Sequence, residues 1–232
     1  DTNTALTGIT HDSRQVVPGS LFCCLRGDRS DGHQFAAAAV AAGAAAVVVE
    51  HPLELDVPQV VVPDTRVAMG PLAASFWGHP SRSLTMVGIT GTNGKTTTAS
   101  LVAAVLEHAG MPTGIIGTLS GKHTTPEATD LQAMLATFVA EGKQAVAMEV
   151  SSHGLALHRV DGCHFDVAVF TNLGRDHLDL HGTMERYFAA KALLFDARLS
   201  DRGVANTDDL HGRLLVDGAS IPMTGFGADG TR

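Results

Sequence analysis

Residues 90–97 read TGTNGKTT, and they lie between an apolar run at residues 84–90 and a run with helical character that ends at His108. Glycine lets backbone N–H groups approach phosphate oxygens without a Cβ clash. The first turn of a helix adds unpaired N–H groups and the positive end of the helix dipole. Lys95 contributes a point charge for the β- and γ-phosphates, and the Thr96 hydroxyl can bind Mg²⁺. The stretch therefore predicts a phosphate loop that binds ATP.

The loop departs at one point from the general phosphate-loop pattern. That pattern, Gly-x-x-x-x-Gly-Lys-[Ser/Thr], requires glycine at position 89, where this chain has Ile89. Its Gly-Lys-Thr core at residues 94–96 is intact. A chance glycine-rich turn is the alternative, but the flanking strand and helix favour a nucleotide site. We expect ATP contacts from the whole loop, that is, from Gly91, Thr92, Asn93, Gly94, Lys95, Thr96 and Thr97.

Apolar runs of strand length alternate with helical runs along the chain. Strands are expected at residues 20–25, 46–50, 59–62, 84–90, 113–117, 144–150, 165–170, 203–206 and 221–226. Helices are expected at residues 33–42, 65–77, 95–108, 130–141 and 183–199. In the fourth of these helices, Leu131, Leu135, Phe138 and Val139 are expected on one apolar face. The alternation predicts the α/β class with a mainly parallel sheet.

The segment Gly78-His79-Pro80-Ser81 separates two blocks, because glycine and proline end a helix and indicate a linker. We expect a small N-terminal α/β domain at residues 1–80. A phosphate-loop-type domain, with helices on both faces of its sheet, is expected at residues 81–232. Nothing follows the last expected strand to cover it, so we expect a piece of a longer protein that is truncated before its central domain ends.

Composition and charge argue against several classes of protein. The chain has 232 residues, a formal charge of −8 and only 16 lysines plus arginines, which argues against a nucleic-acid surface. No run of about 18 apolar residues is present, so no membrane-spanning helix is expected. The first ten residues lack the pattern of a signal peptide. Cys23, Cys24 and Cys163 suggest neither a disulfide framework nor a metal site. We therefore expect a cytoplasmic protein with no nucleic-acid partner and no membrane contact.

Polar side chains follow two further strands, and parallel α/β sheets bind ligands outside the carboxyl ends of their strands. Glu149 ends one strand, where its carboxylate would be a natural Mg²⁺ ligand; a carboxylate that faces water is the alternative. The other strand is followed by NLGRDHLDLH at residues 172–181. Its two histidines and two aspartates suggest a metal or phosphate site, with His177 as the expected ligand.

Lys191 is the unusual residue of the helix expected at residues 183–199. Its neighbours three and four positions away are large and mostly apolar, so it is expected on the buried face: Tyr187, Phe188, Leu194 and Phe195. The alternative is an aliphatic stem that carries its ammonium group out to water.

Taken together, these motifs resemble the Mur ligase superfamily of ATP-dependent amino-acid ligases. The variant loop TGTNGKT, Asn172-Leu173 with Asp176-His177, and a lysine at 191 are that superfamily's forms. Further segments resemble its MurE branch, which adds the third residue of the peptidoglycan stem peptide. These segments are Asp12-Ser13-Arg14, Val17-Pro18-Gly19, Gly27 with Asp31-Gly32, Thr124-Thr125-Pro126-Glu127, and residues 149–155 with Arg159.

The resemblance implies a role for each matching residue. Ser13 and the turn Asp28-Arg29-Ser30 would hold uridine diphosphate. The muramoyl dipeptide would be held by Thr124, Thr125, Ser151 and Arg159. Thr96 and Glu149 would bind one Mg²⁺, His177 would bind a second, and Lys191 would carry a carbamate as a further metal ligand. Asn206 would lie near the adenine. The catalytic residues would be Lys95, Lys191 and His177.

The implied reaction forms an acyl phosphate. The terminal carboxylate of UDP-N-acetylmuramoyl-L-alanyl-D-glutamate attacks the γ-phosphate of ATP, with Lys95 and Mg²⁺ neutralising the anionic groups. The amine of a third amino acid, diaminopimelate or lysine, then displaces phosphate. The family's C-terminal domain, which binds that amino acid, is absent from this chain, so we expect the isolated chain to be inactive. We also expect a monomer.

Two other functions remain open at this stage. A phosphate-loop kinase or ATPase would explain the loop but neither the first block nor the pair His177 and Lys191. A non-catalytic fragment that binds a nucleotide sugar is the second alternative. A folate-type or cyanophycin-type ligase is a nearer relative, which the block Asp12-Ser13-Arg14 disfavours.

Overall fold

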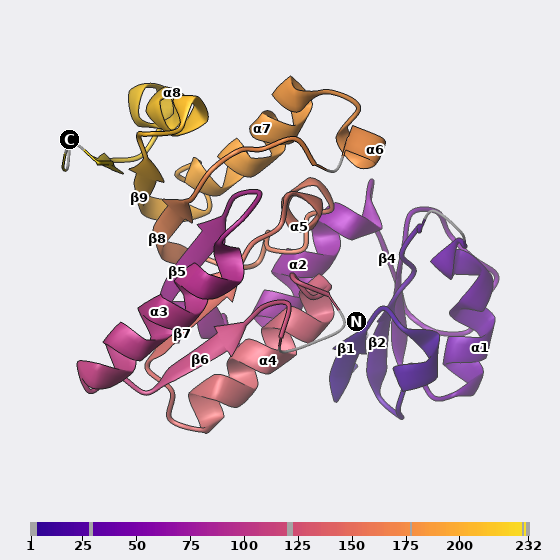
Figure 1. The fold of residues 1–232 in the computed structure, drawn as a ribbon. Coiled ribbons are helices and arrows are strands. Elements are labelled where there is room, and N and C mark those ends of the chain that lie inside the picture. The colour runs from indigo at the N-terminus through magenta and orange to yellow at the C-terminus, as the bar shows by residue number, and fades with distance from the viewer. Residues whose placement is uncertain (1–3, 28–29, 120–122, 177, 229, 231–232) are drawn as a thin grey trace.

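The computed structural model describes residues 4–27, 30–119, 123–176, 178–228 and 230. Two β-sheets lie on opposite sides of a pair of helices, α2 (Thr65–Phe76) and α4 (Ala128–Ala140), which pack on each other (Figure 1). Every paired strand in both sheets is parallel, and helical segments lie between most successive strands, so the predicted α/β class is confirmed.

The first sheet has four strands in the order of the sequence. They are β1 (Gly8–Thr10), β2 (Ser20–Cys23), β3 (Ala46–Val49) and β4 (Gln59–Val61). Short helical segments connect or flank them, namely η1 (Ser13–Gln15), η2 (Gly32–Phe35) and α1 (Ala36–Ala41). All residues of β2 and β3 are buried, which explains why both read as continuous apolar runs.

The second sheet has six strands in the order β10-β9-β8-β5-β7-β6. They are β10 (Met223–Phe226), β9 (Ser200–Asn206), β8 (Phe165–Phe170), β5 (Thr85–Thr90), β7 (Ala145–Glu149) and β6 (Thr113–Ile116). Later strands lie on both sides of β5, so the loops that follow β5, β7 and β8 leave the same edge of the sheet beside one another. This is the place where open parallel sheets bind ligands.

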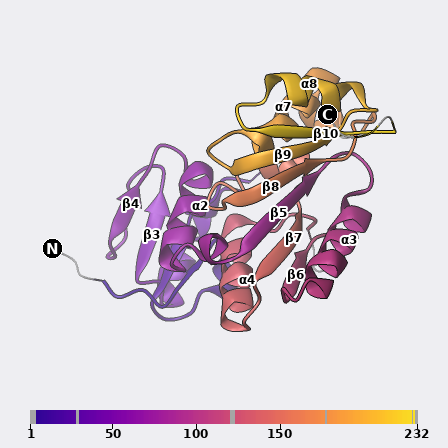
Figure 2. The ribbon, with the colours of Figure 1, turned by 90° about the vertical axis from the view of Figure 1, so that its left-hand side faces the viewer.

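Helices cover both faces of the second sheet, as expected (Figure 2). Val87 and Ile89 of β5 pack against α3 (Lys95–His108), whereas Met86 shares a core with Leu131 and Leu135 of α4. Successive residues of a strand point to opposite faces, which produces this division. The sheet face that α4 covers is also covered by α5 (Ser152–Ala156), α7 (Met184–Ala192) with η4 (Leu193–Phe195), and α8 (Leu210–Gly218).

The boundary expected at residue 80 falls in the connection from α2 to β5, which contains η3 (Pro80–Ser83). The two blocks share a contact surface, because Ala128 of α4 lies in the same apolar core as Ile9 and Met69. Gly70 and Gly162 also approach so closely that a Cβ at either would crowd the other's backbone. The division into separate domains stays a prediction.

Several expected elements differ in the structure. The helix expected at residues 183–199 ends at Phe195, because Asp196 is extended (φ −87°, ψ 140°), and β9 starts at Ser200 and not at residue 203. Val139 is 38% exposed and does not share the buried face of Leu131 and Leu135. Six elements lie outside the expected strands and helices: β1, η1, η3, α5, α6 (Leu178–His181) and α8.

All three cysteines are buried and free, and burial raises the pKa of each thiol to about 12. Within the described ranges, no helix combines the length and apolar character needed to cross a bilayer.

Candidate active site

The phosphate loop joins β5 to α3, as the sequence predicts. Gly94 (φ 86°) is the N-cap of α3 and provides no side-chain cap, so the first N–H groups of the helix are open to a ligand. Gly91 (φ 148°) has a conformation that favours glycine, and a Cβ there would overlap with Thr171 Oγ1. Asn172 holds the loop from the end of β8: its Oδ1 accepts from Asn93 N at 3.0 Å, and its Nδ2 donates to Asn93 O at 3.1 Å.

Lys95 is folded back onto the loop. Its Nζ donates to the carbonyl oxygens of Gly91 at 2.9 Å and of Thr92 at 3.0 Å. Burial lowers the pKa of Lys95, while the charges of Glu149 and Asp176 act in the opposite direction. A phosphate group would replace these carbonyls as the acceptor for the ammonium group.

Lys191 is buried at 1% exposure, so the alternative of an ammonium group carried to water is wrong. Its Nζ donates to Gly91 O at 2.9 Å and lies 4.5 Å from the ring centroid of Tyr187. Burial, followed by the charge of Lys95, lowers the pKa of Lys191 to about 7, against the opposing effect of Asp176. The structure thus brings Lys191 of α7 to the phosphate loop, 100 residues away in sequence.

Glu149 ends β7 beside the loop and is 2% exposed, so the alternative of a carboxylate facing water is wrong. Its Oε1 accepts from Thr118 N at 3.0 Å, and its Oε2 accepts from Thr118 Oγ1 at 3.3 Å. Gly117 permits this approach, since a Cβ there would overlap with the Glu149 carboxylate. No sequence pattern indicated the role of Thr118.

The residues expected to hold the dipeptide form a connected group. Thr125 Oγ1 donates to Glu149 O at 3.1 Å and accepts from Ser151 N at 2.9 Å. Arg159 Nη1 donates to Thr125 O at 3.0 Å, and Thr124 Oγ1 lies 3.1 Å from Thr118 Oγ1. Arg159 Nε is buried and has no hydrogen-bond partner within the described part of the chain. A buried donor of this kind fits an acceptor on a bound ligand.

The remaining expected site residues lie in other loops. Ser13 begins η1, and Ser30 O accepts from Gly27 N at 2.9 Å in a turn after β2. Asn206 is half-buried at the end of β9, where its Oδ1 accepts from Asp208 N at 3.0 Å. Asp209 joins that turn to the loop after β8, because its Oδ2 accepts from Leu173 N at 2.9 Å. Asp28, Arg29 and His177 lie outside the described residues.

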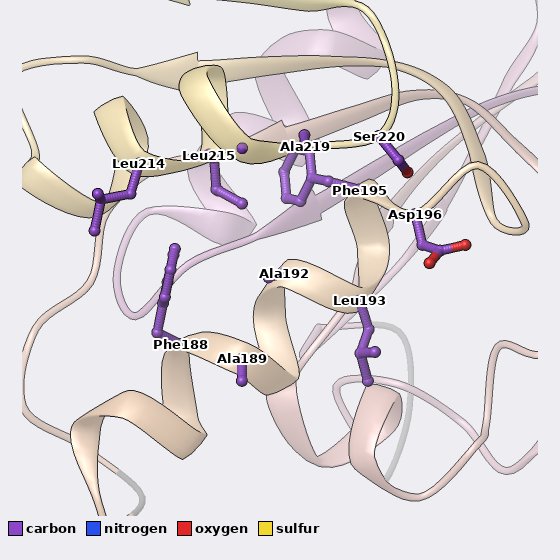
Figure 3. A pocket seen from close by; sticks show the side chains of 11 residues that line it. Phe188, Ala189, Ala192, Leu193, Phe195, Asp196, Leu214, Leu215, Ala219 and Ser220 are labelled. Carbon is purple, nitrogen blue, oxygen red and sulfur yellow. The ribbon is translucent and has the colours of Figure 1, made fainter.

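A groove of about 390 Å³ lies apart from this site, between α7 with η4 and α8 (Figure 3). Its walls are largely apolar and include Phe188, Leu193, Phe195 and Leu214. It lacks the cationic groups that a nucleotide phosphate requires, so the phosphate loop remains the candidate ATP site.

Comparisons with known proteins identify the family. Residues 89–231 match the family model described as Mur ligase middle domain, and residues 5–77 match the model described as Mur ligase family, catalytic domain. This chain belongs to the Mur ligase family.

Its relatives in the Mur ligase family include enzymes of the MurE type. The chain is 49% identical to UDP-N-acetylmuramoyl-L-alanyl-D-glutamate--2,6-diaminopimelate ligase of Streptomyces coelicolor, over 99% of this chain and 48% of that protein. It is 47% identical to the ligase of the same name in Geobacillus kaustophilus, over 97% of this chain and 49% of that protein. A solved structure of a ligase of this name superposes with a TM-score of 0.83 at 33% identity, over 96% of this chain and 48% of that one. The chain thus spans about half the length of the curated relatives it matches.

Mg²⁺ is typical of Mur ligases, and the described residues fit it in part. Thr96 offers a hydroxyl in the first turn of α3, and Glu149 offers a buried carboxylate at the neighbouring strand end. Oxygen ligands of these two kinds are those that Mg²⁺ takes beside a nucleotide. Within the described ranges, no three His, Cys, Asp or Glu side chains gather into a metal site. A fuller ligand set would therefore need ATP oxygens, water, or a modified Lys191.

Proposed function

We propose that this chain provides the ATP site and the nucleotide-sugar site of an ATP-dependent ligase that forms an amide bond. The substrate would be UDP-N-acetylmuramoyl-L-alanyl-D-glutamate, and the added residue would be diaminopimelate or lysine. The names of the relatives favour diaminopimelate. The observation that carries the proposal is the convergence of Lys95 and Lys191 on Gly91, beside Glu149.

The proposed chemistry assigns a task to each of these side chains. Lys95 and the N-terminus of α3 hold the β- and γ-phosphates, which lowers the repulsion that an incoming carboxylate meets. Mg²⁺ bound at Thr96 and Glu149 would supply further positive charge to the phosphates. Arg159 would hold the dipeptide carboxylate so that one oxygen attacks the γ-phosphorus and ADP leaves. The amine of the third amino acid would then attack the carbonyl carbon and release phosphate.

Lys191 would act after modification. A neutral amine attacks the carbon of carbon dioxide and loses a proton, which gives a carbamate whose single negative charge is shared by two oxygens. The lowered pKa of Lys191 supports this step, because it leaves neutral amine near pH 7. The carbamate, together with His177, would bind a second Mg²⁺.

The roles of the other site residues are part of the same proposal. Ser13 and the turn at residues 28–30 would hold uridine diphosphate, and Asn206 would lie near the adenine. Thr124, Thr125 and Ser151 would hold the muramoyl dipeptide together with Arg159. A monomeric state and a cytoplasmic location also stay predictions.

The test uses a full-length protein, as long as the relatives, that contains this chain. It is incubated with Mg²⁺, ATP and the UDP-muramoyl dipeptide, and with either diaminopimelate or lysine. We expect ADP, phosphate and a UDP-muramoyl tripeptide, with diaminopimelate preferred. A phosphorylated product without an amide would favour a kinase, and no turnover of ATP would favour a binding module.

A further inference from the structure

Tyr187 of α7 contacts the phosphate loop, although no sequence motif drew attention to this role. The residue is fully buried, with 0% exposure. Its hydroxyl oxygen lies 3.1 Å from Thr92 Oγ1, and the centre of its ring lies 4.5 Å from Lys191 Nζ. Lys191 in turn donates to Gly91 O. Two side chains that lie four positions apart on one face of α7 thus reach two consecutive residues of the loop.

The hydrogen bonds of the Thr92 hydroxyl determine which group donates to which. Thr92 Oγ1 accepts from Gly174 N at 2.9 Å and donates to Gly174 O at 3.2 Å. A hydroxyl has one proton to donate, so the hydrogen bond between Thr92 and Tyr187 uses the proton of Tyr187. Burial raises the pKa of Tyr187 against the opposing effect of this hydrogen bond, so the phenol keeps its proton near neutral pH.

Through Thr92, Tyr187 also holds the loop that follows β8. Thr92 N donates to Asn172 O at 2.9 Å, and the Thr92 hydroxyl binds both backbone groups of Gly174. The Tyr187 hydroxyl therefore completes a junction of three segments, which are the phosphate loop, the loop after β8, and α7. A loop that is held in its binding conformation before the ligand arrives loses less entropy on binding.

The contacts from α7 become more important when a nucleotide binds. In this structure, Lys95 Nζ donates to the carbonyl oxygens of Gly91 and Thr92. A phosphate group would draw Lys95 away from both carbonyls, because an ionised acceptor forms the stronger hydrogen bond. Lys191 and Tyr187 belong to a different element, so they can continue to hold Gly91 and Thr92 after Lys95 has moved to the phosphate.

We propose that Tyr187 is a positioning residue that holds Thr92, and with it the phosphate loop, in the conformation that binds the phosphates of ATP. This inference rests on the ATP site of the function proposed above. Tyr187 acts through the Thr92 hydroxyl and not through a contact with the nucleotide. Its effect on ATP binding should therefore disappear when the Thr92 hydroxyl is removed.

A tyrosine that only fills the core would behave differently. Tyr187 belongs to the apolar core cluster on the α4 face of the second sheet. Tyr187→Phe keeps the buried ring and removes only the hydroxyl group, so the packing of this core should persist. A core-filling role therefore predicts unchanged affinity for nucleotide in Tyr187→Phe. A positioning role predicts a loss of affinity that depends on Thr92.

The experiment is a double-mutant cycle on Tyr187 and Thr92. Calorimetry with the 232-residue chain measures the affinity for a non-hydrolysable ATP analogue in the presence of Mg²⁺. We expect Tyr187→Phe to weaken binding about three- to tenfold, which is typical for the loss of one neutral hydrogen bond. Thr92→Val keeps the shape of the side chain, removes its hydroxyl and should weaken binding at least as much. In the Thr92→Val background, Tyr187→Phe should change the affinity by less than about twofold, because coupled residues are not additive.

Control variants and a second measurement separate the loop from the core. Phe195→Leu removes a ring from the same core beside the groove of Figure 3, and it should leave the affinity for the ATP analogue within about twofold. Thr92→Ser keeps the hydroxyl and should retain most of the affinity. In the nucleotide-bound chain, Tyr187→Phe should speed amide hydrogen exchange at Thr92 and Asn93, because the loop then opens more often, and should leave the strand β5 unchanged.

The outcomes separate this inference from the proposed function. Unchanged affinity in Tyr187→Phe would overturn the inference and leave the ATP site standing. Additive losses in the double variant would also overturn it, because Tyr187 would then act independently of Thr92. If the parent chain does not bind the ATP analogue, the proposed function is wrong, and the inference falls with it. If Tyr187→Phe does not fold, the Thr92 variants decide, and equal affinity in Thr92→Ser and Thr92→Val overturns the inference.

Discussion

Lys95 and Lys191 donate to the same acceptor, the carbonyl oxygen of Gly91, and each Nζ lies 2.9 Å from it. Lys95 starts α3, whereas Lys191 comes from α7 on the opposite face of the sheet. Burial disfavours the charged form of an ammonium group, and two such groups so close together also repel. The pKa of Lys191 falls to about 7 for these reasons. The phosphate loop therefore lies beside a lysine that can be neutral at physiological pH.

The first prediction concerns stability as a function of pH. The pKa of Lys191 is about 7 in the folded chain and 10.5 in the reference state, so the unfolded chain binds more protons between these values. The free energy of unfolding should therefore rise with pH across this window, with a contribution of up to about 1.4 kcal/mol per pH unit. Lys191→Met keeps the volume and removes the titration. Urea unfolding at pH 7 and pH 9 should show a smaller rise for Lys191→Met than for the parent chain, and parallel changes would refute this prediction.

The second prediction concerns the carbamate. With ¹³C-labelled bicarbonate, the full-length enzyme should show a carbamate carbon signal in NMR, and Lys191→Ala should lack it. Ligation by Lys191→Ala should fall by about 10²–10³-fold, which is typical for the loss of one electrostatic group in an active site. A small carboxylic acid in the buffer should restore part of the activity by supplying the missing oxygen ligands. Full activity of Lys191→Ala would contradict the proposed role.

The third prediction separates the two binding sites. Lys95→Ala should weaken ATP binding about ten- to hundredfold, because a hydrogen bond to a charged group contributes roughly 1.5–3 kcal/mol. Binding of the UDP-muramoyl dipeptide should persist, since its expected contacts lie in other loops. Lys143→Ala is the control, because Lys143 lies partly exposed in the turn before β7. Its Nζ lies 3.9 Å from Glu107 Oε1 of α3. Loss of both ligands in a folded Lys95→Ala chain would argue against separable sites.

The fourth prediction concerns the shape of the loop. Gly91→Ala places a Cβ against Thr171 Oγ1 at a φ of 148°, so ATP binding should be lost and the melting temperature should drop. Gly110→Ala is a matched control. Gly110 also has a positive φ (84°), but its Cβ would meet nothing within 4 Å. That variant should lose only about 1–2 kcal/mol of stability, from backbone strain, and should bind ATP normally. Equal ATP affinity in both variants would show that the loop tolerates a side chain.

The sequence predicted the parts of the fold that local patterns determine. The phosphate loop and α3 begin where the glycines and Lys95 indicate, and apolar runs predicted nine of the ten strands found in the described chain. The missed elements are short or locally ambiguous. α8 was missed although Asp209 caps it, because Gly212 and Gly218 interrupt its helical pattern. After α7, the chain continues from Leu193 as a 3₁₀ turn. The helical pattern of the sequence does not distinguish such a turn from further α-helix.

The candidate site was less accessible to sequence reasoning. Lys191 was singled out by its apolar neighbours, but its shared acceptor with Lys95 depends on how α7 crosses the sheet. Thr118 carries no local signal, because its partner Glu149 lies 31 residues away. Contacts of this range follow from tertiary packing and not from periodicity.

A crystal structure of the chain with the UDP-muramoyl dipeptide, Mg²⁺ and a non-hydrolysable ATP analogue would test the central claim most directly. We predict that the γ-phosphate replaces Gly91 O and Thr92 O as the acceptor of Lys95 Nζ. Mg²⁺ should lie between Thr96 and Glu149, and the dipeptide carboxylate should accept from Arg159. A dipeptide carboxylate bound far from the γ-phosphate, or a nucleotide bound away from Lys95, would contradict the account.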